Sequence, residues 1–182
     1  MARSASAMRG LILESALRQF AVQGFRGTSL QDIASDAGCS KALLLYHFSS
    51  KETICTELLT PARDALATLL DQVAAVEGES RVEMTVTGYV DLALRFSREI
   101  RLLFEDIAEM SRHDALNVME LADRLLDALS GGSHQPPARV AAWMVMGAVF
   151  ITSASDKEVA PDDVLRAEMI RSALRALHHT PS

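Results

Sequence analysis

The sequence contains few of the features that identify disulfide-stabilised, metal-binding or exported proteins. Only two of its 182 residues are cysteines. Cys39 and Cys55 lack the paired spacing of a zinc site or of a disulfide framework. We interpret both as small buried hydrophobic residues in a reducing compartment, and we predict neither a metal site nor a cofactor. The opening "MARSASAMRG" leads into an amphipathic segment with Glu14 and Arg18, which is unlike a signal peptide.

Long apolar runs and catalytic patterns are also missing. The least polar stretch, 140–155, is uncharged for 16 residues, short of the roughly 18 that a membrane-spanning helix needs. No glycine-rich phosphate loop occurs, and "RHD" at 112–114 holds one histidine with neighbours typical of a helix boundary. We therefore expect a soluble cytoplasmic protein that is not an enzyme and has no membrane partner.

Charge is distributed unevenly along the chain. Residues 1–51 carry six lysines and arginines against three acidic residues, a balance of +3. Because the whole chain carries −6, the remaining residues carry −9. A basic segment in an acidic protein indicates a local anionic partner, such as nucleic acid, while the acidic remainder favours solubility.

The hydrophobic periodicity predicts an all-α protein of about nine helices. No window alternates apolar and polar residues as a strand would, whereas Leu13, Ala16, Leu17 and Phe20 repeat with the spacing of one helix face. Glycine, proline and N-capping residues separate the segments. The expected helices cover about residues 8–23, 30–37, 41–48, 51–76, 81–97, 98–110, 114–130, 137–154 and 162–177.

The expected helices 30–37 and 41–48 have the pattern of a helix-turn-helix unit. Two closely crossing helices need a small residue at the contact, a turn residue tolerant of positive φ and an inward hydrophobic residue. Ala34, Gly38 and Leu44 supply these in order. Ser29 opens an approximate capping box for the first helix, and Ser40 is a candidate N-cap of the second.

The outward side chains of the expected helix 41–48 suit the major groove of DNA. They are Lys41, Ala42 and Tyr46 and, more obliquely, Leu43 and His47. Together they offer one charge, hydrogen-bonding groups and small apolar contacts. The alternative is a tight helical hairpin whose outward face is only solvated.

The segment "GFRGTSLQDIASDAGCSKALLLYHFSSKETI" resembles the DNA-binding domain of the TetR family of transcriptional regulators, over about residues 8–54. The resemblance lies in the aromatic residue and glycine that end the first helix, in "TS", in "IASDAG", in "SK" and in "YHFSSKE". It implies an all-α fold with a DNA-binding domain at 1–50 and a helical ligand-binding and dimerisation domain at 51–182.

The same resemblance implies a set of DNA contacts, some to phosphate and others, in the run from Ser40 to Leu43, to base edges or backbone. The expected contacts are Thr28, Ser29, Ser40, Lys41, Ala42, Leu43, Tyr46, His47 and Lys51. The sequence departs from the family pattern at Leu43 and Leu45. Leu43 has no hydrogen-bonding group, so its expected partner is a thymine methyl group.

Three of these contacts have an alternative that the sequence leaves open. The Tyr46 ring would instead pack with Phe48, and Lys51 would be an ordinary lysine at a helix start. His47 would be either a phosphate contact or a solvated ring.

The last two helices are expected to form the dimer interface. The segment 140–151 is apolar on all sides, so a helix there must be covered by its own core and by a second chain. The resemblance implies a four-helix bundle between two copies, and the alternative is a fully internal hairpin. The expected interface residues are Ala141, Val145, Ala148, Thr152, Ala167, Ile170, Leu174 and Leu177.

A ligand cavity is expected in the same helical domain. Bulky residues that would line it are Met84, Tyr89, Phe96, Phe104, Ile107, Met110 and Trp143. Residues of this kind at helical spacing are more often packed in a core. The acidic residues Asp91, Glu105, Asp106 and Glu109 indicate either a cationic ligand or a solvated helix face.

The family resemblance, taken with these patterns, implies a dimeric repressor that binds a near-palindromic DNA operator and is released by a small-molecule effector. The alternative is a ligand-independent DNA-binding or protein-interaction regulator whose pocket is filled by side chains. The sequence leaves open the effector, the operator and whether transcription is repressed or activated.

Overall fold

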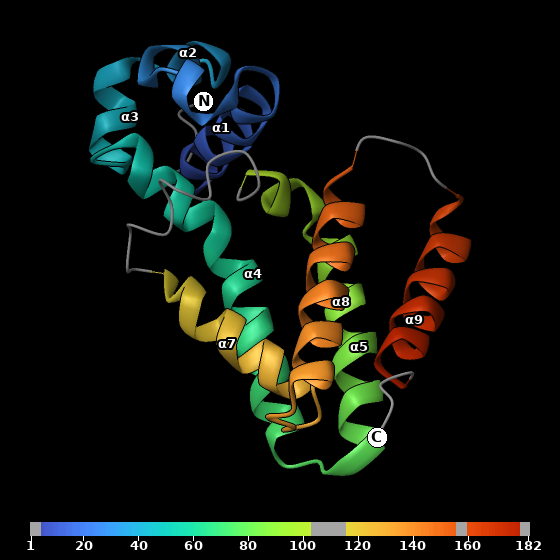
Figure 1. The fold of residues 1–182 in the computed structure, drawn as a ribbon. Helices are drawn as coiled ribbons and strands as arrows, with labels where there is room; N and C mark the ends of the chain where they lie inside the picture. Colours follow the sequence, from blue (N-terminus) through green and yellow to red (C-terminus); the bar gives the residue numbers. More distant parts are fainter. Residues whose placement is uncertain (1–4, 103–115, 156–159, 179–182) are drawn as a thin grey trace. The chain divides into compact units, whose positions relative to one another are not determined.

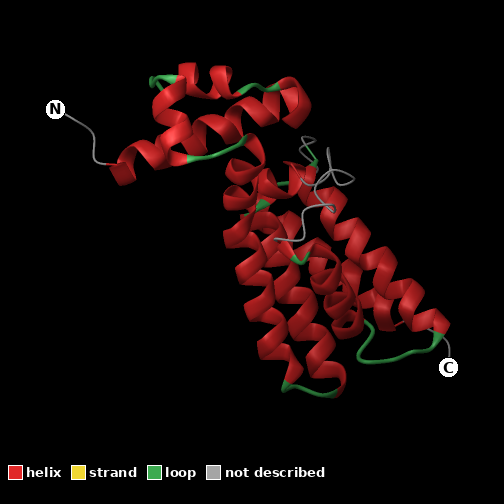
Figure 2. Cartoon of the chain, turned by 90° about the vertical axis from the view of Figure 1, so that its left-hand side faces the viewer, coloured by secondary structure: helices red, strands yellow, loops and turns green. Residues whose placement is uncertain are grey.

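The described part of the chain, residues 5–102, 116–155 and 160–178 of a computed structural model, is helical and contains no strand (Figures 1 and 2). Its helices are α1 (Ala5–Gly27), α2 (Leu30–Asp36), α3 (Lys41–His47), α4 (Lys51–Ala74), α5 (Gly78–Arg95), α7 (Val118–Leu129), α8 (Pro136–Ala154) and α9 (Asp162–His178). The all-α prediction is confirmed. Most of the helix expected at 98–110 lies outside the described residues.

The helices divide between two compact units. The first unit comprises residues 1–61 with 101–116, and the second comprises 62–100 with 117–182. The units divide within α4, at Pro61, whereas the domain boundary expected after residue 50 coincides with the start of α4. Proline has no backbone N–H, so α4 lacks one hydrogen bond of its ladder at this division.

The core of the first unit is built on one face of α1. Ile12, Ala16 and Phe20 recur every fourth residue and are completely buried. Gly24 has a φ of 72°, which bends α1 near its end and brings Phe25 onto Phe20, with ring centroids 5.3 Å apart. α1 packs in this way against α2, which in turn packs against α3.

The turn between α2 and α3 has the three properties predicted for it. Gly38 has a φ of 67°, and the side chains of Ala34 and Leu44 are fully buried. The Cys39 N–H closes the turn by donating to the Ala34 carbonyl at 2.9 Å. Cys55 is buried as expected, whereas Cys39 is only half-buried.

The second unit is built around α5, which contacts α7, α8 and α9. At Gly88, α5 approaches α4 so closely that a Cβ would lie 2.4 Å from Cδ1 of Leu69. Ion pairs on the surface join neighbouring helices: Arg81 with Asp127 at 3.0 Å, Arg124 with Asp71 at 2.6 Å, and Arg166 with Asp91 at 2.5 Å. Because these pairs are exposed or half-exposed, the apolar core is the main source of cohesion.

α8 is divided between the core and the surface of the second unit. Ala142, Val145 and Val149 belong to the core, whereas Trp143 and Met144 are more than half exposed, at 53% and 69%. By length and composition α8 is also apolar enough to cross a membrane, although the uncharged run was expected to be too short. An exposed apolar face of this kind is typical of a surface that contacts another molecule.

Candidate functional site

α3 is held so that most of its side chains face outward. Ser40 is its N-cap, with the hydroxyl oxygen accepting from the Leu43 N–H at 3.1 Å, and Phe48 is its buried C-cap. Leu44 alone among the residues of α3 is buried. The exposed side chains are Lys41, Ala42, Leu43, Leu45 and Tyr46, and His47 is half-buried.

Lys41 and Tyr46 are available to a partner molecule. Within the described part of the chain, neither the Lys41 ammonium nor the Tyr46 hydroxyl has a hydrogen bond or an ion pair. Tyr46 is 81% exposed and meets His47 edge to face, with ring centroids 5.3 Å apart. The structure therefore does not show the alternative packing of Tyr46 on Phe48.

Ser29 and Asp32 form the predicted capping box at the start of α2, which is confirmed. The Ser29 hydroxyl donates to Asp32 Oδ2 at 2.6 Å, and the Ser29 backbone N–H donates to the same oxygen at 2.9 Å. The Asp32 N–H donates back to the hydroxyl at 3.2 Å. These hydrogen bonds, from the hydroxyl first and the backbone second, hold the pKa of Asp32 below its usual range. Ser29 remains exposed at this helix end.

Thr28 and Lys51 face inward, unlike the other expected DNA contacts. The Thr28 side chain is buried, and its hydroxyl donates to the Gly24 carbonyl at 2.8 Å. The Lys51 ammonium donates to the carbonyls of Phe25 and Thr28 and lies 4.3 Å from the centre of the Phe25 ring. Lys51 thus ties the start of α4 to the end of α1, instead of pointing its charge outward as a phosphate contact would.

Two other cations of the first unit, Arg9 and Arg18, are paired with acidic residues. Arg9 on α1 is paired with Glu57 on α4. Arg18 lies 2.8 Å from Asp36 at the end of α2, and this hydrogen bond holds the pKa of Asp36 below its usual range. These ion pairs offset part of the positive charge that residues 1–51 carry. The Lys41 ammonium on α3 has no such acidic partner in the described part of the chain.

The second candidate surface is the exposed apolar stripe of α8. Val140, Met144 and Ile151 recur at helical spacing and are each more than half exposed, together with Trp143. Sequence reasoning placed Trp143 in a ligand cavity, but the structure places it on this surface.

The residues predicted for the dimer interface differ in their burial in the structure. Ala148 and Ala167 are exposed, and Ala141 and Thr152 are half-buried. Val145 belongs to the core of the second unit, which corrects its assignment to the outward stripe. The α9 residues Ile170, Leu174 and Leu177 are partly buried against the same core.

Among the described residues, the four predicted to line a ligand cavity, Met84, Tyr89, Phe96 and Trp143, are not gathered around one. Tyr89 is packed in the core, where its hydroxyl donates to the Met146 carbonyl at 3.0 Å and burial raises its pKa. Met84 is 38% exposed on another side of α5, and Phe96 lies at the end of α5 under the Arg95 guanidinium. Phe104, Ile107 and Met110, and the acidic residues Glu105, Asp106 and Glu109, lie outside the described residues.

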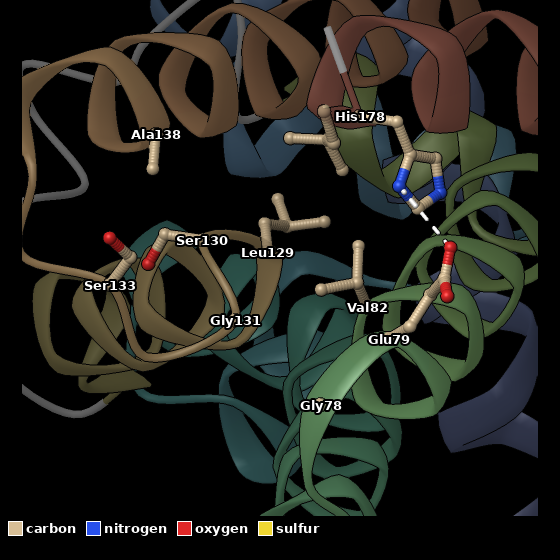
Figure 3. A pocket seen from close by; sticks show the side chains of 10 residues that line it. Gly78, Glu79, Val82, Leu129, Ser130, Gly131, Ser133, Ala138 and His178 are labelled. Atoms are coloured by element: carbon tan, nitrogen blue, oxygen red, sulfur yellow. Dashed lines mark ion pairs between the residues drawn. The ribbon is translucent and has the colours of Figure 1, made fainter. Parts of the chain in front are cut away.

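A pocket of about 320 Å³ opens instead where the start of α5 meets the ends of α7 and α9 and the start of α8 (Figure 3). Its lining consists of Gly78, Glu79, Val82, Leu129, Ser130, Gly131, Ser133, Ala138, Leu177 and His178. Glu79 and His178 face each other, with 3.5 Å between Oε1 and Nδ1. This volume is at the lower end of the range for small-molecule sites. The segments "EGES" and "GGSHQPP" lie at the surrounding helix ends, but no residue pattern in the sequence predicts a pocket there.

Proteins of known family resemble this chain in sequence. Residues 12–58 match the family model "Bacterial regulatory proteins, tetR family". The chain is 32% identical over 149 residues to the HTH-type transcriptional regulator RutR of Escherichia coli, covering 80% of this chain and 66% of RutR. It is 42% identical over 59 residues to the HTH-type transcriptional repressor KstR2 of Mycobacterium tuberculosis, covering 32% of this chain and 30% of KstR2. The chain thus spans about 66% of the length of RutR.

Solved structures share the fold. KstR2 of Mycobacterium tuberculosis aligns with a TM-score of 0.74 at 18% identity, covering 92% of this chain and 93% of KstR2. The structure of AibR in complex with isovaleryl coenzyme A and operator DNA aligns with a TM-score of 0.69 at 20% identity, covering 91% of this chain and 97% of AibR. At these identities the likeness concerns the fold alone.

We predict that Lys51→Met lowers the free energy of unfolding by about 1–3 kcal/mol, because two carbonyls lose a charged donor. The apolar stem remains available to pack on Phe25, so the change isolates the ammonium. Chemical denaturation measures the effect. Lys41→Met is the matched control at an exposed lysine and should change stability by less than about 0.5 kcal/mol. Wild-type stability in Lys51→Met would contradict the structural role.

Proposed function

Because the chain belongs to the tetR family of bacterial regulatory proteins, we propose that it binds double-stranded DNA through α2 and α3 and thereby regulates transcription. The observation that supports this most is the outward face of α3. Lys41 and Tyr46 project from it without partners in the described part of the chain, while the buried Leu44 fixes its orientation. Such a regulator acts in the cytoplasm, where the DNA is.

Most of the outward residues of α3, and the serines that cap α2 and α3, have a proposed role at the DNA. Lys41, Ala42 and Leu43, in the first turn of α3, enter the major groove, since residues near the start of a recognition helix contact base edges. Tyr46 and His47 contact phosphate. The remaining surface contacts are Ser29 and Ser40, which lie at the N-terminal ends of α2 and α3, where backbone N–H groups favour phosphate. Thr28 and Lys51 act indirectly, by holding the unit together.

The protein is proposed to act as a homodimer joined through α8 and α9. The exposed apolar stripe of α8 is a surface that another molecule can bury. The segment 140–155, which contains this stripe, carries no charge that would repel a second copy. Two copies related by a two-fold axis place two α3 helices about 34–36 Å apart, in successive major grooves. The preferred operator is therefore near-palindromic.

A small-molecule effector is proposed to release the DNA, so that the protein acts as a repressor. The fold shared with AibR, whose structure holds isovaleryl coenzyme A and operator DNA, supports a ligand-responsive second unit. The described pocket at the α5 start is one place for such a ligand. One observation favours the alternative of a ligand-independent regulator: Tyr89, expected to line a cavity, is packed and hydrogen-bonded in the core.

Lys41→Met should weaken binding to the preferred duplex by about 5-fold to 150-fold, which corresponds to a lost contact worth 1–3 kcal/mol. Tyr46→Phe should weaken it by about 2-fold to 10-fold, because one hydrogen bond is lost. Fluorescence anisotropy with duplexes selected from a random library measures both. Lys51→Met is the control. Because Lys51 is not proposed to contact phosphate, the DNA affinity of this variant should depend on salt concentration as that of the wild type does. Unchanged affinity in both α3 variants would contradict the docking.

Met144→Glu should convert the dimer into a folded monomer, because a charge on the α8 stripe cannot be desolvated at an apolar interface. Size-exclusion chromatography with light scattering measures the mass. Met119→Glu makes the same change at a methionine that is 62% exposed on α7, and should leave the dimer intact. A dimer in both variants would exclude the α8 stripe as the interface. A wild-type protein that partitions into lipid vesicles would indicate a membrane contact instead.

An effector should reduce affinity for the selected duplex by about 5-fold to 150-fold, the range of coupling energies of 1–3 kcal/mol between linked sites. The measurement is a competition assay of the protein–DNA complex against a panel of metabolites that includes acyl-coenzyme A esters. If the effector binds in the described pocket, it should not reduce the DNA affinity of the Ala138→Phe variant, because the phenylalanine side chain fills the pocket. Full-strength binding across the panel would contradict effector release and favour the ligand-independent regulator.

A further inference from the structure

We propose that α3 selects its DNA sequence chiefly through apolar contact with the C5-methyl groups of thymine, made by Ala42, Leu43 and Leu45. The inference rests on the proposed DNA-binding function and deepens it. Leu45 is added to the contacts expected from the sequence, because its side chain is 44% exposed, slightly more than that of Leu43 at 38%.

The arrangement of these side chains follows from the buried Leu44. With 3.6 residues per turn, Ala42 and Tyr46 lie roughly opposite Leu44, and Leu43 and Leu45 flank them on either side. The small Ala42 in the middle permits close approach of the helix to the groove floor. The outward face therefore carries Ala42 and Tyr46 along its middle and the apolar Leu43 and Leu45 on its two sides, and Lys41 lies at the N-terminal end of the helix.

Apart from Lys41, which can pair with guanine, the side chains that usually discriminate between bases are absent from α3. Arginine pairs with guanine through two hydrogen bonds, asparagine and glutamine pair with adenine, and carboxylates accept from cytosine. The helix sequence "KALLLYH" contains none of these residues. Lys41 can donate to guanine or to phosphate. It therefore contributes to affinity but does not discriminate among the other base pairs.

A leucine in the major groove has one favourable type of neighbour. Of the groups that base pairs present there, only the C5-methyl of thymine is apolar, and the others are hydrogen-bond donors or acceptors. A leucine over a G·C pair displaces water from these polar groups and offers them no replacement. Selectivity thus has two sources, a gain at thymine and a penalty at other bases.

The test uses the whole 182-residue chain and the duplex recovered by repeated selection at low salt. Replacing thymine by deoxyuridine within the half-sites removes the methyl group and keeps every hydrogen-bonding group. Fluorescence anisotropy should show a loss of affinity of about fourfold for each contacted methyl, the value for burying one methylene-sized group. Deoxyuridine between the half-sites is the matched control and should change nothing.

Two variants assign the effect to side chains. Leu43→Ala and Leu45→Ala should each bind the thymine duplex more weakly and lose discrimination against deoxyuridine at one position of the half-site. Val22→Ala, at a residue that is 83% exposed on α1, should retain both properties. Circular dichroism confirms that each variant is folded, and the duplex comparison with wild-type protein does not depend on any variant.

The outcomes separate this inference from the function on which it rests. Equal affinity of the wild-type protein for thymine and deoxyuridine duplexes would overturn methyl recognition and leave DNA binding in place. Failure to bind any duplex at low salt would overturn the proposed function and the inference together.

Discussion

The burial of Leu44 is the interaction on which the rest of the account depends. α2 and α3 are seven residues each, too short to be stable as isolated helices. Their mutual packing, through the buried Ala34 and the positive φ of Gly38, therefore decides which side of α3 meets solvent. Burying a leucine side chain contributes about 1.5–3 kcal/mol, enough to favour one rotation of so short a helix over the others.

In the described part of the chain, the apolar face of α3 and the α8 stripe remain exposed once each unit has formed its core, and their surroundings indicate different partners. The leucines of α3 lie between Lys41 and Tyr46, whose polar groups suit a phosphate-lined groove. The α8 stripe around Trp143 and Met144 has no charged neighbour on its own helix after Arg139, which suits an identical apolar stripe. Exposed apolar area is unfavourable in water by about 25 cal/mol per Å², so both surfaces are stabilised by being covered.

The local rules of helix ends and turns made much of the first unit predictable. The capping box at Ser29, the N-cap at Ser40 and the turn at Gly38 depend on residues within a few positions of each other. A short sequence pattern can therefore predict these caps and this turn. The identity of α3 as an outward-facing helix followed from the same short range of residues, because Leu44 is its one buried position.

Features set by distant residues were not predictable in this way. Lys51 donates to the carbonyl of Phe25, 26 positions earlier, and nothing in its neighbourhood indicates that contact. α8 is apolar on every side, so no period in the sequence shows that Val145 faces the core and Trp143 faces solvent. The pocket between Glu79 and His178 is formed by four helix ends that meet only in the folded chain.

Hydroxyl-radical footprinting of the selected duplex tests the central claim most directly, because it shows where and how often the protein covers the DNA. If two copies present their α3 faces to successive major grooves, protection should appear as two equivalent patches about one helical turn apart on one side of the duplex. A single patch, or uniform weak protection that disappears with moderate salt, would contradict the account.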